Sequence, residues 1–182
     1  MDRLKRQMNL PNQLTIFRIL LIPVIGILMY ASFTWHFQAA LLAYAVAAAT
    51  DTLDGEIARR RNQVTDLGKL LDPLADKLLV ITILSIMVGE GTLAAWVVVI
   101  ILGREFLITG LRFIAAQQGV VIASTPWGKS KTLTQNLMIA ILLLGRPYPP
   151  VGHVAFLFIG LAIITTILSG GDYLWRYRRF IL

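Results

Sequence analysis

Three apolar stretches of this 182-residue chain are too short to cross a membrane unless each continues through charged residues. The uncharged runs at 78–89, 91–103 and 132–145 contain only 12 to 14 residues each, whereas a transmembrane helix needs about 20. With 57% hydrophobic residues and a mean hydropathy of +0.71, six such helices with short loops would use the whole chain. We therefore predict an all-α polytopic membrane protein with six transmembrane helices and no water-soluble domain.

The expected organisation is one membrane-embedded domain covering residues 1–182. A short amphipathic segment at 1–11 precedes a six-helix bundle at about 12–177. Strands are not expected, because lipid cannot satisfy an open sheet edge and the apolar runs do not alternate as a barrel requires. Turn-prone stretches divide the bundle into helices, which we place at about 12–32, 36–61, 66–89, 92–118, 127–146 and 150–177.

Charged residues are predicted to gather on one side of the membrane. The chain reverses direction at each span, so the charged helix ends share a side, and of the 17 Lys and Arg residues only Arg146 lies in an opposite loop. The positive-inside rule makes the charged side, and both termini, cytoplasmic. We expect a polar cavity open to the cytoplasmic headgroup layer. The net charge of +7 then reflects loops facing anionic membrane lipids, and no nucleic-acid partner is expected.

Acidic residues recur at helical spacing in two neighbouring helices. Asp51 and Asp54 are three residues apart, and Gly68, Asp72 and Asp76 follow one another at intervals of four, so each set shares a helix face. A short connection makes the two helices antiparallel neighbours, which brings the carboxylates together. Carboxylates this close must be protonated or hold cations, and Mg²⁺ or Mn²⁺ suits oxygen ligands. A two-metal site at the cytoplasmic interface indicates an enzyme acting on a phospholipid headgroup.

Two alternatives compete with this interpretation. The acids could pair with nearby arginines in an ordinary loop, and Asp66 or Thr65 is better explained as a helix N-cap. That explanation suits Asp72 and Asp76 poorly, because the helix needs them inside the membrane to reach across. A proton- or cation-coupled transporter is the second alternative, but such sites usually lie near the midplane within repeated halves. The chain has no cysteine, which excludes disulfides and thiolate metal sites.

The acidic stretch has the form D-x-x-D-G-x-x-A-R, then eight residues, then G-x-x-x-D-x-x-x-D. It resembles the motif of the CDP-alcohol phosphotransferase family at every fixed position, namely Asp51, Asp54, Gly55, Ala58, Arg59, Gly68, Asp72 and Asp76. The resemblance implies a six-helix membrane fold and a homodimer. It also implies transfer of a phosphatidyl or related group from a CDP-linked donor to an alcohol, with release of CMP.

Three further stretches narrow the resemblance. NLPNQLTIFRILLIP at 9–23, REFLITGLR at 104–112 and WGKSKT at 127–132 look like the bacterial branch that uses CDP-diacylglycerol and sn-glycerol 3-phosphate. That branch acts in phospholipid biosynthesis at the cytoplasmic membrane, with its active site on the cytoplasmic side. The alternative within the family is another acceptor, such as serine or inositol phosphate.

The resemblance also assigns roles to residues. Asp51, Asp54 and Asp72 would ligate metal, and Asp76 would bind a second metal and act as the general base. Residues lining the cytidine and diphosphate would be Gly55, Ala58, Arg59 and Gly68. Asn12, Thr15 and Arg18 would close the nucleotide side, with Asn12 equally plausible as an N-cap.

Because the acceptor carries its own phosphate, a second, basic site is required. The candidates are Arg104, Arg112, Lys129 and Lys131, and the alternative is that they are only positive-inside loop charges. Arg104 and Glu105 point about 100° apart on a helix, so they are not expected to be partners.

Overall fold

The structure is a computed structural model that describes residues 9–60, 65–145 and 152–178. Those residues contain helices and no strand, as predicted. The helices begin and end within about three residues of the predicted bounds, close to the usual uncertainty of helix ends. They are α2 (Leu10–Tyr30), α3 (His36–Arg60), α4 (Asp66–Gly89), α5 (Ala95–Gln117), α6 (Pro126–Gly145) and α7 (Gly152–Arg176).

Side-chain caps define where α2 and α4 begin. Asn9 caps α2 by accepting a hydrogen bond from the Asn12 backbone N–H at 3.1 Å. Asn12 itself lies inside the helix, so the alternative that it is the N-cap is wrong. Thr65 caps α4, because its Oγ1 accepts from the Gly68 N–H at 3.0 Å, which confirms one of the two predicted caps. Each cap satisfies an amide that would otherwise have no partner in the first helical turn.

Glycine closes two helix ends at their C-terminal sides. Gly91 follows α4 with φ of 70°, and Gly119 follows α5 with φ of 75°. This left-handed conformation costs a residue with a Cβ more than it costs glycine, which explains why the chain turns at these positions.

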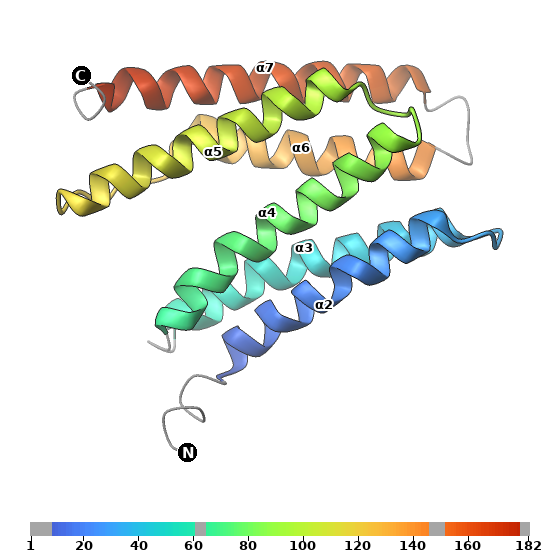
Figure 1. The fold of residues 1–182 in the computed structure, drawn as a ribbon, viewed down its shortest axis with the longest axis horizontal. Helices are drawn as coiled ribbons and strands as arrows, with labels where there is room; N and C mark the ends of the chain where they lie inside the picture. Colours follow the sequence, from blue (N-terminus) through green and yellow to red (C-terminus); the bar gives the residue numbers. More distant parts are fainter. Residues whose placement is uncertain (1–8, 61–64, 146–151, 179–182) are drawn as a thin grey trace. The chain divides into compact units, whose positions relative to one another are not determined.

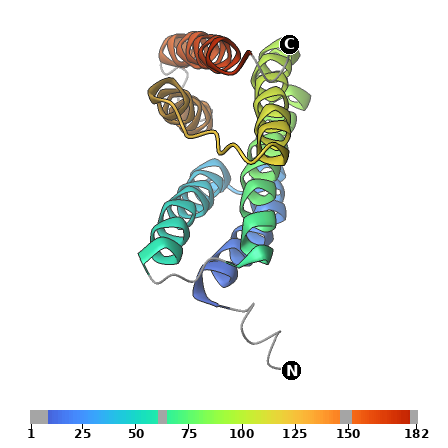
Figure 2. The ribbon, with the colours of Figure 1, turned by 90° about the vertical axis from the view of Figure 1, so that its left-hand side faces the viewer.

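The chain forms two compact units, Met1–Ile86 and Met87–Leu182. In the first unit α2 packs along α3, as Figure 1 shows, and the buried side chains include Ile25, Met29 and Tyr44. In the second unit α5 and α6 both pack against α7, with α6 and α7 seen side by side in Figure 2. The prediction that all 182 residues form one domain stays a prediction.

Two of the described helices are long and apolar enough to cross a membrane, Leu10–Tyr30 and His153–Arg176. Their outer surfaces expose large apolar side chains such as Leu20, Ile27 and Phe156, which suits contact with lipid. The structure therefore supports a helical membrane protein, but the prediction of six transmembrane helices is not confirmed by it. The other helices are interrupted by charged or polar side chains, so they depend on burial of those groups to span a bilayer.

Candidate active site

Arg18 joins the two predicted sets of acids in the first unit. Its side chain on α2 is fully buried, and its Nη1 lies 2.8 Å from Asp51 Oδ1 and 2.7 Å from Asp76 Oδ1. Because both oxygens contact one nitrogen, the carboxylates of α3 and α4 are close enough to bind a single cation. Their side chains are 46% and 49% exposed, so a polar ligand could also reach them.

Thr15 extends the same face of α2 to the third acid. Its hydroxyl is buried and donates to Asp72 Oδ1 at 2.6 Å, while the Pro11 carbonyl lies 3.1 Å away. Thr15 and Arg18 are three residues apart and therefore lie on one helix face. This face of α2 thus contacts Asp72 and Asp76 from α4.

Asn12 explains why residue 68 is a glycine. Its Nδ2 donates to Thr65 Oγ1 at 2.7 Å, and a Cβ added at Gly68 would lie only 2.7 Å from Asn12 Oδ1. Glycine therefore allows α2 to pack closely against the beginning of α4. The predicted role of Gly68 in lining the nucleotide stays a prediction.

The carboxylates fit a hard divalent cation in their chemistry. In the part of the chain whose side chains are described, no group of three or more acidic or histidine residues forms a ready metal centre. However, Asp51 and Asp76 already hold a cationic group between them, the Arg18 guanidinium. Carboxylate oxygens are the ligands that Mg²⁺ and Mn²⁺ prefer. The predicted site residues whose side chains lie outside the described part are Asp54, Gly55, Ala58 and Arg59.

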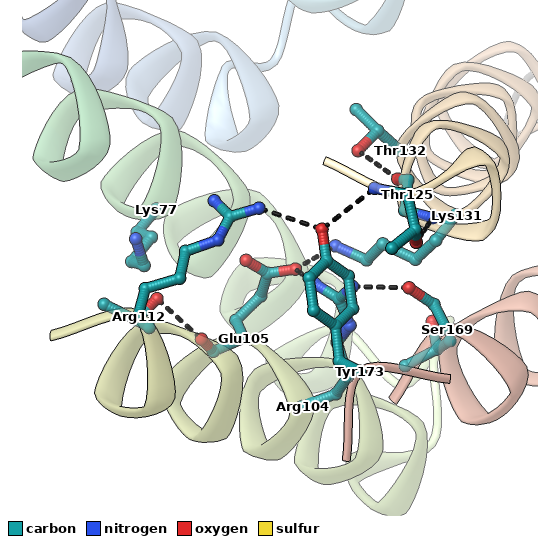
Figure 3. Close-up of polar contacts among 12 residues, drawn as sticks. Lys77, Arg104, Glu105, Arg112, Thr125, Lys131, Thr132, Ser169 and Tyr173 are labelled. Carbon is teal, nitrogen blue, oxygen red and sulfur yellow. Dashed lines mark hydrogen bonds and ion pairs between the residues drawn. The ribbon is translucent and has the colours of Figure 1, made fainter. Parts of the chain in front are cut away.

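A second polar centre lies in the second unit, around Glu105. Its Oε1 is ion-paired with Lys131 Nζ and lies 3.1 Å from Arg104 Nη1. The expectation that Arg104 and Glu105 are not partners is therefore wrong. Consecutive helical residues point in different directions, but both side chains are long enough to meet above the helix surface. Arg104 also donates to Ser169 Oγ of α7, as Figure 3 shows.

Arg112 lies about two turns further along α5 than Arg104. Its Nη2 donates to the Tyr173 hydroxyl at 2.9 Å. We refer to Arg104, Arg112 and Lys131, with Glu105, as the basic cluster. Lys131 is buried, whereas Lys129 is exposed and is absent from the described contacts of the cluster. The structure thus brings three of the four predicted phosphate-binding residues together.

Two polar residues in this region escaped the sequence interpretation. Ser169 and Tyr173 lie one turn apart on α7 and are almost completely buried. The sequence at the C-terminal end of this helix indicates an aromatic and basic membrane anchor. That interpretation does not predict the contacts that Ser169 and Tyr173 make with α5. The available signal is the spacing of four between the serine and the tyrosine, which puts both on one face of the helix.

Residues 8–168 match the family model of the CDP-alcohol phosphatidyltransferases. Three proteins named CDP-diacylglycerol–glycerol-3-phosphate 3-phosphatidyltransferase are similar over nearly their whole length. The Bacillus subtilis protein is 42% identical, and the match covers 91% of this chain and 93% of that protein. The Pseudomonas fluorescens protein is 37% identical, with 96% of this chain and 89% of that protein covered. The Shigella flexneri protein is 39% identical, with 97% of this chain and 98% of that protein covered.

Proposed function

Since the chain belongs to the CDP-alcohol phosphatidyltransferase family, we propose that it transfers the phosphatidyl group of CDP-diacylglycerol to sn-glycerol 3-phosphate. The products are phosphatidylglycerophosphate and CMP. The observation that carries this proposal is the meeting of Asp51 and Asp76 at one cationic group. The relatives named for this reaction, similar over nearly the whole chain, support the choice of donor and acceptor.

The acidic residues are proposed to hold Mg²⁺ or Mn²⁺ in a two-metal site. The ligands would be Asp51, Asp54 and Asp72, with Asp76 contributing to the second metal. When bound, the metals would neutralise the pyrophosphate of the donor and the charge that develops on departing CMP. The Arg18 contacts support this proposal, because they bring one carboxylate oxygen of Asp51 and one of Asp76 beside the same cationic group.

Asp76 is proposed as the general base. It would accept the proton of the acceptor hydroxyl while that oxygen forms a bond to the β-phosphorus of the donor. The bond between this phosphorus and the oxygen of CMP breaks, and CMP leaves with the electron pair. The carboxylate of Asp76 is about half exposed, and Arg18 holds its Oδ1 in place. A base must be both accessible and oriented to do this.

The donor's nucleotide is proposed to lie against the same motif. Gly55, Ala58, Arg59 and Gly68 would line the cytidine and diphosphate, and Asn12, Thr15 and Arg18 would close that side. The contacts of Thr15 with Asp72 and of Arg18 with Asp76 support a role for α2 in orienting the acids.

The basic cluster is proposed to bind the phosphate of glycerol 3-phosphate. Arg104, Arg112 and Lys131 supply guanidinium and ammonium donors, and arginine can grip phosphate through two parallel hydrogen bonds. Lys129, which is exposed, would contact the same phosphate from the solvent side of the cluster. The cluster contains three cations and one carboxylate, so it remains positive after its internal ion pairs form.

The membrane arrangement is also part of the proposal. Six helices would span the bacterial cytoplasmic membrane, with the active site and both termini in the cytoplasm, and the protein would be a homodimer. The apolar outer surfaces of α2 and α7 support contact with membrane lipids. The one-sided distribution of Lys and Arg supports the orientation.

The proposal is tested by measuring CMP release with the purified protein in detergent micelles. CDP-diacylglycerol is the donor, and glycerol 3-phosphate, serine and inositol phosphate are supplied separately. We expect release with glycerol 3-phosphate, loss of activity in EDTA, and recovery on adding excess Mg²⁺ or Mn²⁺. Release only with another alcohol would favour another member of the family. Cation flux in liposomes without CMP release would favour a transporter and overturn the proposal.

A further inference from the structure

Tyr173 lies at the centre of contacts that join all three helices of the second unit. The residue is 1% exposed, and it packs with Ile108, Leu111 and Ala115 of α5. Its hydroxyl accepts from Arg112 Nη2 at 2.9 Å and from the Thr125 backbone N–H at 3.1 Å. It donates to the Ala123 carbonyl at 3.3 Å. One proton and two lone pairs are therefore all used, so the hydroxyl is fixed in orientation.

The ring of Tyr173 contacts two cations. The guanidinium carbon of Arg104 lies 5.3 Å from the ring centroid and that of Arg112 lies 5.5 Å from it. Both distances are within the range of cation–π attraction, which lowers the cost of gathering two positive groups. Figure 3 shows the Tyr173 hydroxyl joined by dashed lines to Arg112 and to Thr125. A single residue therefore orients both arginines of the basic cluster.

The hydroxyl also fixes the beginning of α6. Thr125, which donates to it, caps this helix by accepting from the Gly128 N–H at 3.1 Å. A Cβ added at Gly128 would lie 3.4 Å from the Tyr173 hydroxyl, in van der Waals contact, so the hydroxyl packs directly against the first turn of α6. Lys131, in the second turn of α6, reaches Glu105. Tyr173 thus connects to every cation of the cluster, directly or through the first two turns of α6.

We propose that Tyr173 is a positioning residue that holds Arg104, Arg112 and the α6 N-terminus ready to bind the phosphate of the acceptor. Positioning matters most for Arg112. Its side chain is exposed and has many rotamers, so it loses much conformational freedom when it binds an anion. A buried hydroxyl that already holds it removes part of that loss before the substrate arrives. The inference rests on the proposed function, since it names what organises that site.

The test compares the steady-state kinetics of Tyr173→Phe with those of the wild-type protein. Phenylalanine keeps the ring and removes only the hydroxyl. We expect the KM for glycerol 3-phosphate to rise about tenfold, because a hydrogen bond to a charged group is lost. The kcat and the KM for CDP-diacylglycerol should change less than about twofold. Tyr177→Phe is the matched control, since Tyr177 directly follows α7 and its ring stacks on Tyr173 at 6.2 Å. This variant should leave the acceptor KM unchanged.

A double variant separates positioning from mere support of the fold. If Tyr173 acts through Arg112, then Tyr173→Phe should add little to the acceptor KM of Arg112→Ala. Independent, multiplying effects would overturn the inference, as would an unchanged acceptor KM in Tyr173→Phe. A fall in kcat and melting temperature without an acceptor-specific effect would also reject it. If Tyr173→Phe does not fold, Gly128→Val, whose methyl groups extend beyond a Cβ position 3.4 Å from the hydroxyl, must raise the acceptor KM or the inference fails. Absence of CMP release by wild-type protein with glycerol 3-phosphate would instead reject the proposed function.

Discussion

Arg18 of α2 and Asp76 of α4 form an ion pair at 2.7 Å in which the arginine side chain is fully buried and the aspartate side chain is 49% exposed. The same Arg18 nitrogen contacts Asp51 of α3 at 2.8 Å. The protein thus supplies its own cation to two acids that would otherwise repel each other, while part of each carboxylate stays accessible. This relationship leads to the first prediction.

Replacing Arg18 should increase the dependence of stability on divalent metal. Arg18→Met keeps much of the buried volume but removes the cation between Asp51 and Asp76. We expect the unfolding free energy without metal to fall by about 1–3 kcal/mol, since both carboxylates are half exposed and partly screened by solvent. Thermal melting in detergent, with EDTA and with Mg²⁺, measures this change. The stabilisation by Mg²⁺ should be larger in Arg18→Met than in the wild-type protein.

Arg176→Met is the control for that experiment. Arg176 pairs with Asp172 on the exposed end of α7 and has no described contact with the acids of α4. Its response to Mg²⁺ should match that of the wild-type protein. An equal or smaller response in Arg18→Met would count against a shared cation site.

Neutralising either acid of α4 should nearly abolish turnover. Asp72→Asn and Asp76→Asn each remove a charge that the proposed metals and the proton transfer require, so CMP release should fall by about 10²–10⁴-fold. The matched control is Asp172→Asn on α7, which alters an acid outside the motif. Near-normal CMP release in both α4 variants would remove these residues from the mechanism.

Truncating Arg104 should weaken acceptor binding selectively. Arg104 contacts Glu105 and Ser169 and is the deepest arginine of the basic cluster. Arg104→Ala should raise the KM for glycerol 3-phosphate at least about tenfold, because a charge-assisted contact to phosphate is lost. The KM for CDP-diacylglycerol should stay within about twofold. Equal increases in both KM values would indicate a general loss of structure rather than loss of a phosphate contact.

A methyl group at residue 68 should destabilise the first unit. In Gly68→Ala the new Cβ would meet Asn12 Oδ1 at 2.7 Å, so buried Asn12 must shift from Thr65. We expect a loss of about 1–3 kcal/mol in unfolding free energy, which is usual for overpacking. Gly103→Ala is the matched control, because nothing lies within 4 Å of its added Cβ. That helical substitution should be neutral or stabilising by up to about 1 kcal/mol. Equal melting temperatures for the two variants would contradict tight packing at residue 68.

Helix positions were predictable because the residues that begin or end a helix lie close to its ends in the sequence. Turn-forming glycines and the threonine cap at residue 65 stand beside the helix ends in the chain, and the structure places the ends there. The cap of α2 was less predictable, since Asn9 and Asn12 are both suitable residues three positions apart. The choice depends on where Asn12 finds a partner, and that partner, Thr65, lies 53 residues away.

Contacts between long side chains were harder to predict. Arg104 and Glu105 point apart at their Cα atoms, yet both reach the same space and join Lys131 and Ser169 from other helices. Spacing rules describe the directions of Cβ atoms and not the positions of flexible side-chain ends. The contacts of Tyr173 were not predicted either, because they involve the flexible ends of Arg104 and Arg112.

By itself, the sequence determined the all-helical class, the helix order and the helical spacing of the aspartates, because these depend on residues a few positions apart. Only the tertiary structure decided which partner each polar group has: Arg18 with Asp76 across 58 residues, and Arg112 with Tyr173 across 61. A hydrogen bond requires its atoms within about 3 Å. Chain segments so far apart meet at that distance only when the packed helices hold them there.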